Sequence, residues 1–213
     1  QNAPYPTRSL PENLADINAA LASLRTGEEA LQKLVRDHGL EKVHHYMAAL
    51  KQSAAEALQT ILKDIENQTF SAEESLDDGY KICIKIAIQN GQIEIDFDGT
   101  STVHPGNLNA NISIVYSAVI YVLRLLCNKE IPLNEGLMKN VHIQLPISFL
   151  HPDFSDNDLQ NPAVVGGNTE VSQRLVDTLL KALNLAACSQ GTMNNFLFGN
   201  ERFGYYETIG GGT

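Results

Sequence analysis

Two aspartates that stand two residues apart are the first candidates for chemistry in this sequence. Asp96 and Asp98 lie in the segment IEIDFDGTSTVHPGNLNAN, residues 93–111, directly after an alternating apolar run. An Asp-x-Asp-Gly-Thr run at the end of a strand can present one aspartate as the nucleophile of phosphoryl transfer and the other as an acid. The alternative is that the run is only a polar turn after a hydrophobic strand. The elements predicted around it distinguish between these two interpretations.

The residues around this run predict a β-hairpin. Large apolar residues alternate with smaller or polar ones on both sides of Asn90-Gly91, which is a strong two-residue turn signal. The turn places three apolar pairs on one face of the hairpin, namely Ile88–Ile93, Ile86–Ile95 and Ile84–Phe97. Lys85 then lies opposite Asp96 on the other face.

This register argues against a phosphatase of the haloacid-dehalogenase type. The nucleophile of such an enzyme ends a central parallel strand, which is apolar on both faces. Here the strand is the second arm of an antiparallel hairpin, and Lys85 pairs with Asp96 across it. The sequence also has no downstream Gly-Asp or Asp-Asp pair to hold magnesium. We therefore expect Asp96 to be a solvated sheet residue, while Asp98 stays open as a catalytic candidate.

A loop rich in asparagine follows the hairpin. Asn107, Asn109 and Asn111 precede an apolar run at 112–127, which predicts a helix that is apolar nearly all round and therefore buried. Carboxamides donate and accept hydrogen bonds, and the helix N-terminus adds free N–H groups that suit an oxyanion or a phosphate. In the plainer interpretation one asparagine caps the helix and the others form turns. His104 is the one histidine that we retain as a site candidate.

The segment VVGGNTE, residues 164–170, repeats this arrangement. Gly166 and Gly167 permit close approach of the backbone, Asn168 or Thr169 would cap the next helix, and Glu170 lies in its first turn. No P-loop lysine follows, so direct ATP binding is not predicted. Glu170 could activate a water molecule, although a first-turn glutamate more commonly complements the helix dipole.

Two later segments are weaker candidates. One is SQGTMNN, residues 189–195. The other is ETIGGG, residues 207–212, in which Glu207 follows two tyrosines on a predicted strand. The glycines after Glu207 resemble a backbone cradle for a ligand.

Apolar periodicity predicts the α+β class. Residues 12–38 and 41–66 form two amphipathic helices, which we expect to pack as an antiparallel pair and to make residues 1–66 a helical scaffold segment. Residues 67–213 are expected to form an α+β segment with a mixed sheet. Its elements are the hairpin, a buried central helix, a strand within 140–148, an amphipathic helix at 170–184 and two final strands.

Composition limits the partners and the compartment. A net charge of −10 argues against nucleic acid and anionic membranes, because both are bound mainly through lysine and arginine. The most apolar stretch, 112–127, is too short to span a bilayer. The three cysteines form no CxxC pair, which favours a reducing, cytoplasmic compartment. Because the chain begins at Gln1 and stops in a glycine run, we expect an excerpt of a longer protein.

Seven segments together resemble one family, in the family's order and over nearly all 213 residues. They are ENLADINAALASLRTG, HGLEKVHHYMAAL, DFDGTSTVHPGNLNAN, IPLNEG, NPAVVGGNTEVSQRLVD, SQGTMNNFLFG and YYETIGGG. These runs are similar to the hydantoinase B/oxoprolinase subunits, which belong to ATP-dependent enzymes that open five-membered cyclic amides. Acetone and acetophenone carboxylases are relatives. The resemblance implies that this chain is part of the hydrolytic subunit of such an enzyme.

The resemblance also implies a division of labour within an oligomeric complex. A hydantoinase A-type subunit or domain handles ATP, the ring carbonyl is phosphorylated, and water attacks the activated carbon. This chain would hold no cofactor, any divalent metal of the complex would lie upstream of Gln1, and the isolated chain would be inactive. The family usually has serine where this chain has Asp98, so Asp98 is not expected to be an indispensable nucleophile.

We expect polar loops at 98–111, 161–170, 188–195 and 207–213 to line one hydrolytic cavity. The candidate catalytic residues are Asp98, Asn109 and Glu170. The candidates for binding the substrate are Thr100, His104, Asn107, Asn111, Gly166, Gly167, Asn168 and Glu207, and none of these residues is expected to bind a metal.

Two other functions fit the same resemblance. In a ketone carboxylase the cavity would carry an activated enol in place of a ring. In a non-catalytic assembly module, the helices at 12–66 would dock the partner subunit and the chemistry would happen elsewhere. A phosphatase remains the most distant alternative.

Overall fold

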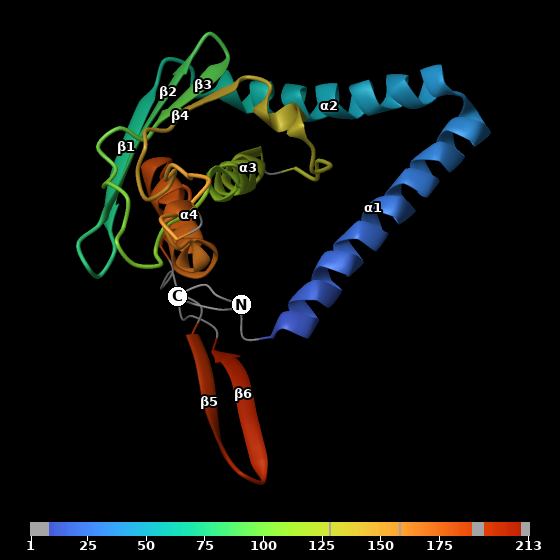
Figure 1. The fold of residues 1–213 in the computed structure, drawn as a ribbon. Coiled ribbons are helices and arrows are strands. Elements are labelled where there is room, and N and C mark those ends of the chain that lie inside the picture. Colours follow the sequence, from blue (N-terminus) through green and yellow to red (C-terminus); the bar gives the residue numbers. More distant parts are fainter. Residues whose placement is uncertain (1–8, 128, 158, 189–193, 210–213) are drawn as a thin grey trace.

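The computed structural model describes residues 9–127, 129–157, 159–188 and 194–209 (Figure 1). The helices are α1 (Leu10–His38), α2 (Leu40–Leu62), α3 (Ile112–Cys127) and α4 (Ser172–Ala182), with a 3-10 turn η1 (Glu135–Met138) and a π-helical turn η2 (Gly167–Val171). The strands are β1 (Thr69–Ser75), β2 (Lys81–Gln89), β3 (Gln92–Asp96), β4 (Val141–Gln144), β5 (Asn194–Asn200) and β6 (Phe203–Ile209).

Strands β1 to β4 form one mixed sheet, which confirms the α+β class. Its order is β1-β2-β3-β4, with β3 and β4 parallel and the other pairs antiparallel. The predicted hairpin register is present, because Ile88 pairs with Ile93 and Lys85 with Asp96. Strand β1 was not predicted, since TFSAEES has a single large apolar residue and its pairing partner is what makes it a strand.

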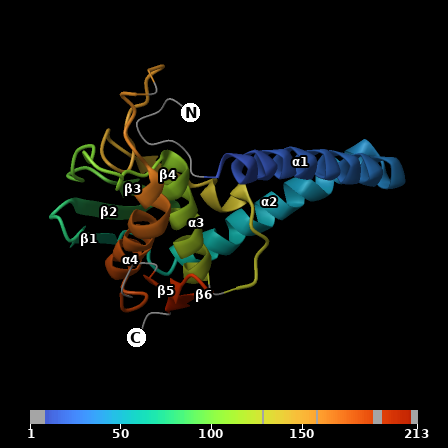
Figure 2. The same ribbon diagram turned by 60° about the horizontal axis from the view of Figure 1, so that its bottom comes forward.

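The core lies between one face of this sheet and the helices α3 and α4. The isoleucines of β2 and β3 meet Val119 and Leu123 of α3 and Leu179 of α4. Figure 2 shows α3 and α4 side by side on this face of the sheet. The C-terminal half of α2 adds Leu58 and Leu62, which are buried in the same core. Burial of this apolar face is the main stabilisation of the fold.

The predicted antiparallel helix pair does not form a packed unit. Helices α1 and α2 diverge from a corner at Gly39, which has a positive φ of 83° that favours glycine (Figure 1). Helix α1 buries none of its residues, and Met47 and Leu50 of α2 are also exposed. The expectation fails because the buried, apolar half of α2 packs on the sheet core, and among the described residues no element buries the apolar side chains of α1.

The expectation for the central helix needs correction. Helix α3 is buried on one face, while Ile112, Tyr116 and Leu125 on the other face are exposed. The two final strands are present as predicted, and β5 and β6 pair with each other in a separate exposed hairpin. Among the described residues, no helix combines the length and the apolarity that a membrane span requires.

Candidate functional site

The Asp96–Asp98 run is a turn that closes strand β3. The Asp96 Oδ1 accepts a hydrogen bond from the Asp98 backbone N–H at 2.9 Å, and Gly99 has a positive φ of 87°. Such a carboxylate-to-backbone bond is the usual signature of an aspartate that starts a turn. Asp98 is exposed, and the described residues include no group of three or more His, Cys, Asp or Glu that could hold a metal. A catalytic role of Asp98 stays a prediction.

Thr100 and Ser101, which follow the turn, form hydrogen bonds with the backbone at the start of β2. The Thr100 hydroxyl accepts from the Cys83 N–H at 3.1 Å and donates to the Cys83 carbonyl at 3.2 Å. The Ser101 hydroxyl accepts from the Lys81 N–H at 2.8 Å. Thr100, a predicted substrate contact, therefore has its hydroxyl engaged with the backbone in this chain.

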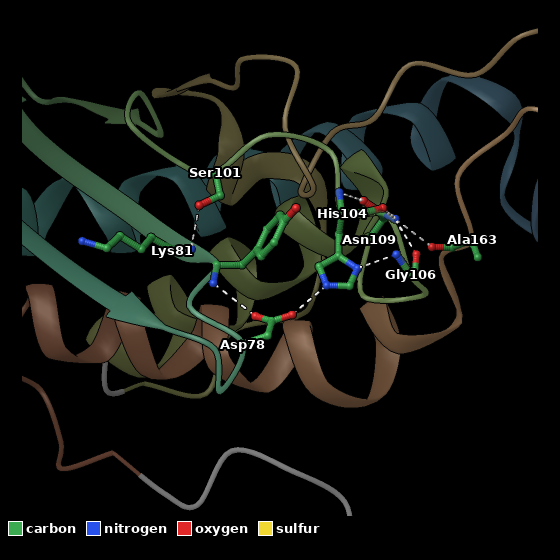
Figure 3. Close-up of polar contacts among 8 residues, drawn as sticks. Asp78, Lys81, Ser101, His104, Gly106, Asn109 and Ala163 are labelled. Carbon is green, nitrogen blue, oxygen red and sulfur yellow. Dashed lines mark hydrogen bonds and ion pairs between the residues drawn. The ribbon is translucent and has the colours of Figure 1, made fainter.

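His104 forms a pair with Asp78, a residue that the sequence analysis did not single out (Figure 3). The His104 Nε2 lies 2.7 Å from the Asp78 Oδ2, and the His104 Nδ1 accepts from the Gly106 N–H at 2.9 Å. Because Nδ1 is the acceptor, Nε2 carries the proton and donates to Asp78. The Tyr80 ring packs edge-on against the imidazole with centroids 4.5 Å apart. Both ring nitrogens therefore form hydrogen bonds within the protein, one to the β1–β2 turn and one to the loop itself.

The Asp78 carboxylate accepts a second hydrogen bond, from the Tyr80 backbone N–H at 3.1 Å. This bond and the bond from His104 hold the pKa of Asp78 below its ordinary value of 3.8. The pair thus joins the β1–β2 turn to the loop after β3, two segments that the hairpin pattern alone does not bring together.

Asn109 is buried and organises the loop from inside. Its Oδ1 accepts from the His104 N–H at 2.8 Å, and its Nδ2 lies within hydrogen-bond distance of the carbonyls of His104, Gly106 and Ala163, at 2.9, 3.1 and 3.0 Å (Figure 3). This geometry uses both amide hydrogens and the amide oxygen. In this conformation the Asn109 side chain builds the loop and has no group left for a ligand, so its predicted catalytic role would require the loop to rearrange.

The other two asparagines follow the plainer interpretation in part. The Asn111 Oδ1 accepts from the Ile114 N–H at 3.2 Å, so Asn111 caps α3 as one of the three was expected to do. Asn107 is exposed, and its backbone carbonyl accepts from the Gly166 N–H at 2.8 Å.

Two polar bends, one at residues 104–111 and one at residues 164–170, pack directly against each other. Two hydrogen bonds join them, from the Asn109 side chain to the Ala163 carbonyl and from the Gly166 N–H to the Asn107 carbonyl. The two glycines also lie directly against the backbone of the asparagine loop. A Cβ on Gly166 would stand 2.7 Å from the Asn107 carbonyl oxygen, and one on Gly167 would stand 2.4 Å from that of Asn109. Both contacts are shorter than van der Waals distance, so only glycine permits this packing.

The helix after the glycines does not begin as expected. A π-helical turn, η2, precedes α4, and Gly166 occupies the N-cap position of η2. Neither Asn168 nor Thr169 caps η2 or α4 with its side chain. Glu170 lies half-buried inside this turn. Its role as a base that activates water stays a prediction.

A cavity of about 550 Å³ lies beside these bends, between α3 and α4. Asn168 lines it, whereas its lining includes none of the other predicted site residues. Ser117 of α3 and Asp177 of α4 also line the cavity, and the sequence analysis missed both. Asp177 is only 4% exposed, yet it lies two residues from both Leu175 and Leu179, on the side of α4 opposite the predicted inward stripe, so apolar periodicity gave no signal for it.

Glu207 does not join this site. It lies on the separate β5–β6 hairpin, which projects away from the sheet and its helices (Figure 1). The Tyr205 hydroxyl donates a hydrogen bond to the Glu207 carboxylate, which raises the pKa of Tyr205. Residues 189–193 and 210–213 of the remaining predicted loops lie outside the described residues.

Comparison with known proteins places this geometry in a family. The model of the hydantoinase B/oxoprolinase family matches residues 2–213. The chain is 40% identical to 5-oxoprolinase 1 of Arabidopsis thaliana and to a 5-oxoprolinase of Dictyostelium discoideum, over 97% of its length in both. It spans about 17% of the length of each of these curated relatives.

Two solved structures share the fold. An ATP-dependent caprolactamase from Pseudomonas jessenii superposes with a TM-score of 0.63 at 21% identity, over 87% of this chain and 32% of that chain. A nucleotide-free acetone carboxylase superposes with a TM-score of 0.59 at 16% identity, over 79% of this chain and 25% of that chain. With the family model matching almost every residue and the two packed bends falling within it, the chain belongs to the hydantoinase B/oxoprolinase family.

Proposed function

We propose that this chain is part of the hydrolytic subunit or domain of an ATP-dependent cyclic-amide hydrolase that opens a hydantoin or 5-oxoproline ring. The observation that carries this proposal is the 40% identity to two proteins named 5-oxoprolinase over 97% of the chain. The superposition on an ATP-dependent caprolactamase supports the fold on which such chemistry would take place.

Amide resonance explains why such an enzyme would consume ATP. Phosphorylation of the ring carbonyl oxygen would make the carbon open to attack by water, and the site would need donors for the developing negative charge. We assign ATP binding to a hydantoinase A-type partner, because the glycine pair at 166–167 is followed by Asn168 and no P-loop lysine. This chain would bind and position the cyclic-amide ring.

A divalent metal does not fit the described residues. His104 is the histidine nearest to the two bends, and both of its ring nitrogens are engaged, with Asp78 and with the Gly106 N–H. No group of three or more potential metal ligands is present in the described part of the chain. We therefore propose that no step of ring opening uses a metal ion bound by the described residues.

The test of this function uses the full-length protein together with its A-type partner. With ATP and magnesium, we expect 5-oxoproline or hydantoin to be opened, and the ring-opened acid and ADP to appear in equal amounts by mass spectrometry. Omission of the partner should abolish both products. Formation of a carboxylated product from a ketone and bicarbonate, without ring opening, would assign the carboxylase alternative.

Glu170 is our candidate for the base that activates water. Replacement by glutamine keeps the size of the side chain and removes its basicity. Ring opening by the Glu170→Gln enzyme should fall by about 100-fold or more, the usual contribution of a general base. Glu201→Gln, at an exposed position in the β5–β6 turn, is the matched control. Equal losses in both variants would remove Glu170 from the mechanism.

We further propose that the protein acts in the cytoplasm as an oligomer with this partner, and that the 213 residues alone are inactive. The exposed apolar residues of α1 favour an additional docking role for the helices at 12–66, which is our second candidate function. Deletion of α1, residues 10–38, which buries none of its side chains, should then abolish co-purification with the A-type partner. Retained co-purification would exclude this docking role.

A further inference from the structure

The cavity between α3 and α4 has two chemically different sides. Its apolar side is lined by Ile114, Ala118, Val176 and Leu180. Its polar side includes Ser117, Asn168 and Asp177. A volume of about 550 Å³ with a mainly apolar lining and a few convergent polar groups is typical of a small-ligand site.

Asn168 is held at this cavity by packing that leaves its side chain free. The glycine pair before it lies against the backbone of Asn107 and Asn109, where a Cβ would clash. The backbone carbonyl of Asn168 accepts from the Ser172 hydroxyl at 2.7 Å, whereas its carboxamide has no hydrogen-bond partner among the described residues. Asn168 also lies in the π-helical turn η2, and such turns occur frequently at functional sites.

We propose that Asn168 recognises the cis-amide edge of a lactam or hydantoin ring bound in this cavity, an assignment that rests on the proposed function. A small ring forces its amide to be cis, so the carbonyl oxygen and the N–H lie side by side on one edge. An open-chain amide is almost always trans and presents them on opposite sides. The Asn168 carboxamide offers an N–H donor and an oxygen acceptor side by side, which matches the cis edge with two hydrogen bonds.

This pairing makes Asn168 a specificity-determining residue. Cleavage of the ring C–N bond by water converts the ring carbonyl to a carboxylate and releases the nitrogen as an amine from a lactam or as a ureido group from a hydantoin, so the cis edge of the ring amide is lost. The described lining has the carboxyl group of Asp177 and no lysine or arginine, so it offers no cation to an acidic substituent of the ring. Recognition in this cavity therefore depends on the ring amide itself.

The experiment titrates the full-length protein with two neutral lactams, followed by saturation-transfer NMR without ATP. The probes are 2-pyrrolidinone and its N-methyl derivative, which lacks the N–H. Wild type should bind 2-pyrrolidinone about five- to tenfold more tightly, the value of one hydrogen bond whose acceptor is otherwise left unpaired. Asn168→Ala and Asn168→Asp should lose this preference, and Asn168→Gln should keep part of it. Gln59→Ala removes an exposed carboxamide of α2 outside the cavity lining and should behave as wild type.

The two proposals fail in different ways. A preference for 2-pyrrolidinone that survives in Asn168→Ala, or no measurable binding of either lactam, overturns the assignment of Asn168. ATP-dependent ring opening with an unchanged KM in Asn168→Ala likewise overturns it and leaves the proposed function standing. Lactam binding that depends on Asn168, without ring opening by the complete complex, supports the assignment and contradicts the proposed function.

Discussion

The four-stranded sheet and helix α1 both carry large apolar side chains at regular spacing, but these side chains are buried in the sheet and exposed on α1. Ile82 and Ile88 of β2 are completely buried, whereas Leu21 and Leu24 of α1 are 49% and 71% exposed. Helices α3 and α4 pack against the apolar face of the sheet, whereas no element in the described part of the chain buries the apolar side chains of α1. Regular apolar spacing thus predicts the type of element, while burial depends on a partner.

The two β-hairpins repeat this contrast. The β2–β3 hairpin places its apolar residues in the core, while the β5–β6 hairpin gathers Phe196, Phe198 and Tyr205 in an exposed aromatic cluster. An isolated two-stranded hairpin is marginal in water. Within the described residues, the regions with exposed apolar side chains therefore include α1, the first half of α2 and the β5–β6 hairpin.

The largest expected effect compares the same side chain in both regions. Phe97→Ala should lower the free energy of unfolding by about 3–5 kcal/mol, because Phe97 is fully buried and leaves a cavity. Phe196→Ala, at a half-exposed position of β5, should cost less than about 1 kcal/mol. Urea unfolding of the isolated chain, followed by circular dichroism, measures both. Equal costs would show that the hairpin is buried, and would break the comparison.

A buried polar residue should rank next. Asn109→Ala should destabilise the chain by about 2–3 kcal/mol, because the His104, Gly106 and Ala163 carbonyls lose their donor. The matched substitution Asn195→Ala, on the exposed β5–β6 hairpin, should cost well below about 1 kcal/mol. Thermal unfolding measures both variants. An Asn109→Ala protein of wild-type stability that nevertheless opens no ring would return Asn109 to the catalytic candidates.

Replacement of glycine by alanine should lower stability at the packed bend that contains Gly167 and raise it in the exposed helix α1. Gly167→Ala places a Cβ 2.4 Å from the Asn109 carbonyl oxygen and should destabilise by about 1–3 kcal/mol. Gly27→Ala, inside α1 with no atom within 4 Å of the new Cβ, should stabilise that helix by up to about 1 kcal/mol. Helical ellipticity during thermal unfolding reports both. A destabilising Gly27→Ala would indicate that a partner packs closely on α1.

The smallest effect concerns pH. The lowered pKa of Asp78 means that its two hydrogen bonds stabilise the fold above the ordinary carboxyl value of 3.8, and that this stabilisation is lost as the pH falls through the lower, folded-state pKa. Asp78→Asn should therefore be less stable than wild type at pH 6, and the difference should shrink below pH 3.8. Asp37→Asn, which breaks an exposed ion pair on α1, should match wild type at each pH. Urea unfolding at several pH values provides the comparison.

The hairpin shows how far sequence reasoning reaches. Asn90-Gly91 and the alternation around it predicted the register of Lys85 and Asp96, which the structure confirms, and this register argued against a phosphatase strand. The same reasoning missed β1, whose strand character comes from pairing with β2. It also missed Asp78, because the contact of Asp78 with His104 joins residues 26 positions apart and leaves no periodic trace.

The sequence by itself determined the helices, the register of the β2–β3 hairpin and the family segments, since these depend on neighbours within a few residues. Only the tertiary structure decided what the candidate residues do. It turned the Asn109 amide towards backbone carbonyls, one of them 54 residues away, and placed Asn168 at a cavity between two helices. The physical reason is that an asparagine can serve the backbone or a ligand with the same groups, and the packing of distant segments selects between them.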